Sequence, residues 1–208
     1  MIKFLNCEID ISKKVFVPRI ETEFWAKRVI ENLKKENKNS KIFVLDIFAG
    51  TGCIGISLLK NLPFVKLDFI DISKEAIEQI KINLELNKIS QNRYKIFQSN
   101  FFEKVKEKKY DLILANPPYV AKERIWEVQD WILKKEPHLA LFSEKGGLFH
   151  IKKFLNEVKN HLKPKGSFYM EFDPLQKLEI EKILKKQNIK FEFYKDQFKK
   201  WRFVKGKI

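Results

Sequence analysis

Short apolar runs alternate with amphipathic stretches along the chain from Lys41 onward. The runs are rich in β-branched and aromatic residues and have the length of strands, whereas the stretches between them repeat apolar residues at helical spacing. Such alternation predicts a mostly parallel sheet with helices on both of its faces. We expect seven strands, at residues 42–46, 65–71, 94–98, 112–115, 167–172, 190–194 and 202–205.

Four of the amphipathic stretches present one apolar face each, and the first predicts a helix over residues 21–35. No helical stretch separates the last two strand runs, so these should form an antiparallel hairpin at one edge of the sheet. The faces expected to pack on the sheet are Trp25, Val29 and Leu33; Ala76, Ile77, Ile80 and Leu84; Leu148, Ile151, Leu155 and Val158; and Leu175, Leu178 and Leu184.

The N-terminal residues 4–17 have two short apolar stretches around a polar centre at residues 7–14, which indicates a β-hairpin. No internal repeat and no linker rich in Pro, Gly or Ser divides the sequence. We therefore expect one α/β domain over residues 1–208, with the hairpin in residues 1–18 and the sheet with its helices in residues 19–208.

The formal net charge is +15, from 42 Lys and Arg against 27 Asp and Glu. Such a charge favours weak association with nucleic acid or the ribosome, but the lysines are scattered, so a merely Lys-rich surface is an equal alternative. No apolar run is long enough to cross a membrane, and we expect a cytoplasmic protein. Cys7 and Cys53 are expected to be packing residues. The three histidines, His138, His150 and His161, are expected to be packing or surface residues, and no metal site is expected.

A glycine-rich loop follows the first core strand and opens a helix, within residues 44–55. Its exposed N–H groups can meet an anionic group of a nucleotide-like ligand. No Lys-Ser or Lys-Thr pair follows, so this is no phosphate-binding P-loop. Gly50, Gly52 and Gly55 have the spacing of a dinucleotide fingerprint, yet Asp46 would repel a pyrophosphate and suits the positive charges of S-adenosylmethionine.

Asp71 ends the second core strand, where a carboxylate can accept hydrogen bonds from both ribose hydroxyls. The alternative is a role at the start of the next helix, although Ser73 can cap that helix itself.

Asn116-Pro117-Pro118-Tyr119 follows the fourth core strand, at the sheet edge where open α/β sheets bind ligands. The prolines lack N–H groups, so the segment presents acceptors: the Asn116 side-chain oxygen and the Pro117 carbonyl can hold both hydrogens of a planar NH2 group. Tyr119 adds an aromatic wall. This pattern indicates methyl transfer to an amide or an exocyclic amine.

These residues resemble the N5-glutamine methyltransferases of peptide chain release factors, the HemK/PrmC family. The likeness extends from about Phe16 to Lys205, and the entry Pro18-Arg19-Ile20-Glu21-Thr22-Glu23 together with the Asn-Pro-Pro-Tyr segment is its most specific part. Further matches are Glu136-Pro137, Ala140-Leu141 and Gln176.

The resemblance implies a Rossmann-like, class I S-adenosylmethionine-dependent methyltransferase acting on the glutamine of a release factor's Gly-Gly-Gln loop. It implies catalytic roles for Asn116, Pro117 and Tyr119, and a substrate site made of Asn116, Pro117, Pro118 and Tyr119. The cofactor-binding residues it implies are Asp46, Phe48, Ala49, Gly50, Thr51, Gly52, Asp71, Asn100, Phe101 and Asn116.

The sequence departs from the family at Phe48, which replaces a loop glycine, at Asn100, which replaces an acid, and at Gly146, which also replaces an acid. The N-terminal helical domain of bacterial relatives is not expected in this chain. The alternatives are an N6-adenine methyltransferase acting on RNA or DNA, a ribosomal-protein glutamine methyltransferase and a non-catalytic adenosylmethionine-binding protein.

Overall fold

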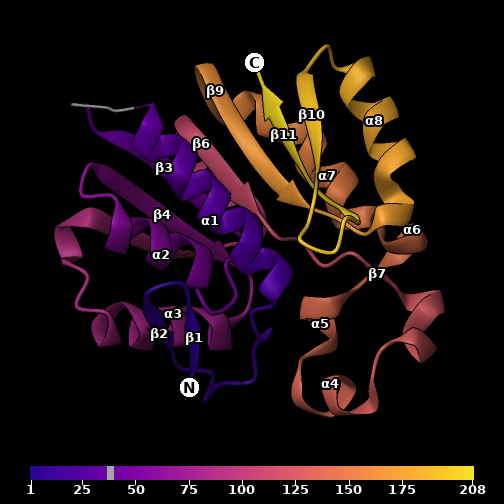
Figure 1. Ribbon diagram of the computed structural model, residues 1–208, viewed down its shortest axis with the longest axis horizontal. Helices are drawn as coiled ribbons and strands as arrows, with labels where there is room; N and C mark the ends of the chain where they lie inside the picture. Colours follow the sequence, from indigo (N-terminus) through magenta and orange to yellow (C-terminus); the bar gives the residue numbers. More distant parts are fainter. Residues whose placement is uncertain (37–39) are drawn as a thin grey trace.

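A seven-stranded sheet with the order β10-β11-β9-β6-β3-β4-β5 forms the centre of the computed structural model, which describes residues 1–36 and 40–208 (Figure 1). Each predicted strand run overlaps one strand of this sheet, and the Rossmann-like fold is confirmed. The strands are β3 (Ile42–Ile47), β4 (Val65–Asp71), β5 (Tyr94–Gln98), β6 (Tyr110–Ala115), β9 (Leu162–Glu171), β10 (Lys190–Lys195) and β11 (Trp201–Lys207).

Parallel pairing joins β5, β4, β3, β6 and β9, and β11 then pairs antiparallel with both β9 and β10. The edge hairpin expected from the sequence is therefore present. Because β6 and β9 lie side by side with Ala115 opposite Met170, the residues that follow each strand continue next to one another. This register places the segment after β6 beside the end of β9.

Helices cover both faces of the sheet. One core combines the sheet with α1–α3 through Trp25, Ile56 and Ile80, and the other combines it with α7 and α8 through Phe154 and Ile180. In Figure 1, α1 and α2 lie to the left and α7 and α8 to the right. The bounds are α1 (Ile20–Lys35), α2 (Cys53–Asn61), α3 (Lys74–Leu86), α7 (Phe149–Val158) and α8 (Lys177–Lys186).

The connection from β6 to α7 passes beyond the carboxyl ends of the strands. It contains the two-residue strands β7 (Val120–Ala121) and β8 (Phe142–Ser143), which pair in parallel. Its short helices are α4 (Asp130–Lys135), α5 (His138–Leu141) and α6 (Glu144–Gly147), with the 3-10 turn η3 (Lys122–Glu127). Further 3-10 turns are η1 (Gln91–Arg93), η2 (Glu103–Val105), η4 (Lys159–His161) and η5 (Pro174–Gln176).

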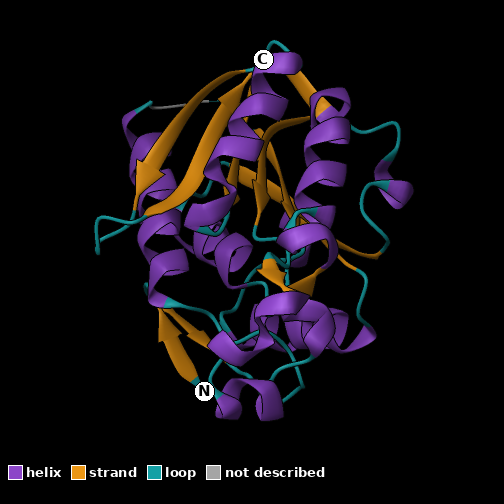
Figure 2. Ribbon diagram, turned by 90° about the vertical axis from the view of Figure 1, so that its right-hand side faces the viewer, coloured by secondary structure: helices purple, strands orange, loops and turns teal. Residues whose placement is uncertain are grey.

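The N-terminal hairpin exists, but its predicted bounds were wrong. Its strands are β1 (Ile2–Phe4) and β2 (Cys7–Ile9), which turn at Leu5-Asn6, and it lies below the main sheet in Figure 2. Residues 10–19 form no strand, because their polar groups bond elsewhere: Asn83 Oδ1 of α3 accepts from Asp10 N at 2.7 Å. The hairpin itself is bonded by Asn87, at the end of α3, whose side chain accepts from Glu8 N and donates to the Glu8 carbonyl. No strand pattern reveals these contacts.

The predicted apolar face of α8 was also wrong in part. Leu184 is buried, but Leu175 and Leu178 are 73% and 68% exposed, and Ile180 takes their place in the core. The cause is a capping box in which Asp173 bonds the N–H of Leu175 and Gln176 bonds the N–H of Asp173. This box starts the helix at Lys177 and leaves Leu175 in the preceding turn.

Both cysteines are buried and free, as expected of packing residues. In the described parts of the chain, no helix is long and apolar enough to cross a membrane. The same residues contain no group of three or more His, Cys, Asp or Glu side chains arranged to hold a metal ion.

Candidate active site

A cavity of about 1160 Å³ lies at the carboxyl ends of the parallel strands. Most of the predicted site residues line it, although they come from four separate segments of the chain: Phe48, Ala49, Gly50, Thr51, Asp71, Asn100, Phe101, Asn116, Pro117, Pro118 and Tyr119. Asp46 and Gly52, which were also predicted, do not line the cavity.

The glycine-rich loop turns sharply between β3 and α2. Phe48, Gly50 and Gly52 all have positive φ, at 61°, 55° and 76°. Among the described atoms, a Cβ on Gly50 would meet only Phe16 Cβ, at 4.0 Å, so the loop leaves room for a ligand to approach its backbone. Phe48 adopts its conformation at a cost of about 1–2 kcal/mol, and its ring packs edge-on against Phe101 with centroids 5.2 Å apart. A phenylalanine can thus occupy the family's glycine position.

Asp46 is fully buried beneath this loop and fixes the start of α2. Its Oδ2 accepts from the N–H of Gly55 at 2.9 Å, and its Oδ1 has no hydrogen-bond partner among the described residues. A Cβ on Gly55 would lie 2.9 Å from Asp46 Oδ2 and 2.4 Å from the Phe69 ring. The glycine spacing that imitates a dinucleotide fingerprint therefore reflects close packing of α2 on β3 and β4. Burial raises the pKa of Asp46 to about 8. The predicted direct contact with the cofactor does not fit this position, because the side chain is fully buried, bonds Gly55 N and does not line the cavity.

Asp71 lies at the end of β4 and faces the cavity. One oxygen accepts from Gly50 N at 2.8 Å and the other from Ser73 N at 2.9 Å. The Ser73 hydroxyl accepts from Ala76 N and caps α3, so the helix does not need the carboxylate. Burial raises the pKa of Asp71, and the backbone hydrogen bonds oppose that rise. Each carboxylate oxygen keeps a lone pair that can accept a hydroxyl.

Aromatic rings form the neighbouring wall. The Phe101 ring is parallel to that of His150, with centroids 5.9 Å apart, and Lys153 Nζ lies 4.2 Å from the Phe101 centroid. Asn100 Nδ2 donates to Glu103 Oε1 at 2.9 Å, which directs its oxygen away from that partner as a free acceptor. His150 was interpreted as a packing or surface residue, yet it lines the cavity with Nδ1 2.8 Å from Ser143 Oγ.

The buried carboxylate Glu171, which was not among the residues predicted from the sequence, connects α1 to Tyr119. Its Oε2 accepts from Thr22 Oγ1 and Trp25 Nε1, both at 2.7 Å, and its Oε1 accepts from the Tyr119 hydroxyl at 2.9 Å. Asn116 Nδ2 in turn lies 3.4 Å from Thr22 Oγ1. The available signal was a charged residue inside the apolar run 167–172, where an ionisable group requires partners.

Burial is the largest influence on both titratable members of this network. It raises the pKa of Glu171, and the hydrogen bonds from Trp25, Thr22 and Tyr119 oppose that rise. The pKa of Tyr119 is raised well above 10, first by burial and then by the Glu171 charge. Tyr119 is therefore neutral at pH 7, and its hydroxyl serves as a donor to Glu171.

Two further contacts hold the segment that follows β6. Gln176 Nε2 donates to the Tyr119 carbonyl at 2.8 Å and to the Gly146 carbonyl at 3.3 Å. Across the cavity, Arg19 forms an ion pair of 2.6 Å with the buried Glu136, which connects the chain before α1 to the segment between α4 and α5. Of the motif residues in the resemblance, Arg19, Thr22, Glu136 and the segment 116–119 thus line one cavity.

The Methyltransferase small domain family matches residues 21–149. The release factor glutamine methyltransferase of Streptococcus pneumoniae is 33% identical over 97% of this chain and 70% of its own length. The protein of the same name from Lactococcus lactis is 32% identical over 89% of this chain and 66% of its own length. The chain thus spans about two thirds of the length of these relatives.

Among solved structures, the N-terminal domain of human METTL16 in complex with SAH is similar, with a TM-score of 0.67. It is 17% identical, over 97% of this chain and 75% of that one, and such a likeness shows a common methyltransferase fold. The chain belongs to the release factor glutamine methyltransferase family, within the wider group of small methyltransferase domains.

Proposed function

We propose that this protein transfers the methyl group of S-adenosylmethionine to the side-chain nitrogen of the glutamine in a release factor's Gly-Gly-Gln loop. The observation that carries this proposal is that Asn116 and Pro117, which can offer a side-chain oxygen and a backbone carbonyl as a pair of acceptors, both line the cavity. The family relationship supplies the substrate, since the relatives named above are release factor glutamine methyltransferases.

The cavity residues fit the cofactor. The open backbone of Gly50 suits the amino-acid portion, Asp71 suits the ribose hydroxyls, and the Asn100 oxygen with the Phe101 ring suits the adenine. Asp46 acts indirectly, by fixing the start of α2 through Gly55. When bound, the cofactor supplies an electrophilic methyl group.

The protein's own contribution is orientation and polarisation of the amide. An amide nitrogen is a poor nucleophile because its lone pair is delocalised. Asn116 Oδ1 and the Pro117 carbonyl accept its two hydrogens, which increases electron density on nitrogen and fixes its direction of attack. Once methylated, the nitrogen loses one of these two protons to the solvent and becomes a neutral N-methyl amide. Pro117 and Pro118 bring no N–H group that would compete for these acceptors. Tyr119, kept neutral first by burial and then by the Glu171 charge, offers its ring to the planar amide and is no base.

Transfer from tritiated S-adenosylmethionine tests the proposal. We expect the purified protein to label a release factor, and replacing the glutamine of its Gly-Gly-Gln loop by Asn should abolish the label. Ribosomal proteins and RNA are offered in parallel reactions. Label in RNA with an unlabelled release factor would show an adenine methyltransferase, and label in a ribosomal protein alone would show the other glutamine substrate.

A further inference from the structure

The orientation of the Asn116 side chain decides whether it can act on a substrate amide. An Asn side chain has a donor end and an acceptor end, and only the oxygen can hold an N–H of the substrate. The two ends are distinguished by their hydrogen-bond partners. In this structure Nδ2 faces Thr22 Oγ1 at 3.4 Å, so the opposite end, Oδ1, is the one available to the cavity.

Thr22 can impose this orientation because its single hydroxyl proton is already used. Thr22 Oγ1 donates to Glu171 Oε2 at 2.7 Å, and the same oxygen accepts from the Trp25 indole at 2.7 Å, so Oε2 serves as an acceptor. The indole is a donor only, and the Tyr119 hydroxyl bonds Oε1. With its proton committed to Glu171, Thr22 has only lone pairs left for Asn116, and these accept the NH2 end.

The residues of this hydrogen-bond network are held by separate elements, α1 and β9. Thr22 and Trp25 lie one helical turn apart in the first half of α1, and both are buried. Glu171 ends β9, directly beside the end of β6 that precedes Asn116. At 3.4 Å the Asn116–Thr22 contact is long, so it selects between two orientations more than it adds stability.

We propose that Thr22 and Glu171 are positioning residues, which form a one-way chain of hydrogen bonds that turns the Asn116 oxygen toward the substrate amide. This inference rests on the proposed function and deepens it. It gives a physical task to Thr22, which the resemblance includes only as part of the motif Glu21-Thr22-Glu23.

Thr22→Val tests the chain of hydrogen bonds, because valine keeps the shape and removes the hydroxyl. We expect kcat to fall by about 10- to 100-fold, while KM for the release factor and for S-adenosylmethionine stays within about threefold. Thr22→Ser restores the hydroxyl and should restore kcat to within about threefold. Ser57→Ala is the matched control, since it removes a buried hydroxyl that donates to Ile54 O at 2.7 Å within α2.

A second measurement reads the orientation without any substrate. The side-chain amide of Asn116 is identified in a 15N spectrum by its loss in Asn116→Ala, and the exchange of its protons with water is followed. Exchange of the Asn116 Nδ2 protons should be slow in the wild type and in Thr22→Ser, because the hydroxyl at position 22 accepts from Nδ2 in both. It should be faster in Thr22→Val, which has no such acceptor.

Unchanged exchange in Thr22→Val overturns the inference, as does unchanged kcat in a wild type that methylates the release factor. Equal losses of kcat in Thr22→Val and Ser57→Ala would also overturn it, because they would show a general effect on folding. If the wild type does not label the release factor, the proposed function fails by itself, and the exchange measurement still decides the orientation.

Discussion

At the scale of single residues, Asn116 and Asn100 should separate the two halves of the reaction. Asn116→Ala removes an acceptor for the substrate amide, and we expect the single-turnover rate to fall by about 10²- to 10³-fold. S-adenosylmethionine affinity, measured by calorimetry, should change by less than about threefold, because the Gly50–Asp71 side of the cavity stays intact.

Asn100→Ala is the matched control for this prediction. It removes the oxygen assigned to the adenine, so it should weaken cofactor binding and leave the rate at saturating cofactor close to that of the wild type. Loss of cofactor binding in Asn116→Ala, with normal transfer once the cofactor is saturating, would contradict both assignments.

The buried carboxyl of Asp46 should make stability depend on pH. Its pKa of about 8 in the fold lies above its value of 3.8 in the unfolded chain, so between these values the folded state holds a proton that the unfolded state releases. The resulting stabilisation is complete below pH 4 and is lost as the pH rises through 8. Asp46→Asn has no such proton.

The free energy of unfolding of Asp46→Asn minus that of the wild type should therefore increase with pH. Between pH 5 and 7.5 the increase should reach up to about 1.4 kcal/mol per pH unit. Urea denaturation of both proteins across this range checks the slope. A difference that stays constant with pH would mean that Asp46 is ionised in the fold.

At the scale of elements, two adjacent glycines offer a matched pair of substitutions near the segment 116–119 that follows β6. Gly146 and Gly147 both have positive φ, at 67° and 81°, so alanine strains the backbone at either position. A Cβ on Gly147 would lie 2.1 Å from the Tyr119 carbonyl oxygen and 2.5 Å from Gln176 Nε2, whereas a Cβ on Gly146 meets no described atom within 4 Å.

Gly147→Ala should therefore displace the segment that follows β6. We expect kcat/KM for the release factor to fall by at least about tenfold and the melting temperature to drop, because the Gln176–Tyr119 hydrogen bond is lost with the overlap. Gly146→Ala should lose only the stability that the backbone strain costs, about 1 kcal/mol, with little change in kcat/KM. Equal effects of the two substitutions on kcat/KM would argue against a role for the loop's position.

The elements that could be predicted are those whose sequence pattern is local. The strand runs and the face of α3 depend only on which neighbouring residues are apolar, and the structure confirms them. The Asn116–Thr22–Glu171 network was not predictable in the same way, because its members come together only through the order of strands in the sheet. The start of α8 depends on a capping box, which changes the direction of Leu175 without changing the apolar spacing.

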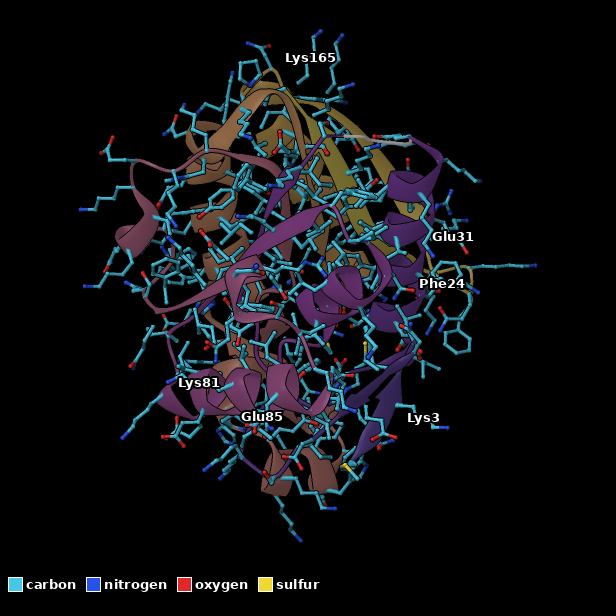
Figure 3. The ribbon with its side chains drawn as sticks, turned by 90° about the vertical axis from the view of Figure 1, so that its left-hand side faces the viewer. Lys3, Phe24, Glu31, Lys81, Glu85 and Lys165 are labelled. Carbon is cyan, nitrogen blue, oxygen red and sulfur yellow. The ribbon has the colours of Figure 1, made fainter. Side chains whose placement is uncertain are left out.

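At the scale of the whole molecule, the net charge of +15 invites a test of how it is distributed. Figure 3 shows Lys3, Lys81 and Lys165 in well-separated parts of the molecule, and all three are exposed. Acidic residues lie among them, such as Glu85 on the same helix as Lys81. Lysines as far apart as these three can contact only a few phosphates of one nucleic acid at a time.

We therefore expect weak RNA binding with a moderate dependence on salt. Between 50 and 200 mM KCl, the affinity for a duplex RNA, measured by fluorescence anisotropy, should fall by about 10- to 100-fold, and not by the 10³- to 10⁵-fold typical of six to ten phosphate contacts. Lys3→Glu, Lys81→Glu and Lys165→Glu should each weaken binding by a similar small factor. One substitution with a much larger effect, together with a steep salt dependence, would instead reveal a defined nucleic-acid surface on that face.

Because a long-range electrostatic attraction raises the encounter rate without altering the methyl-transfer step, kcat at saturating release factor should stay constant over the same range of salt.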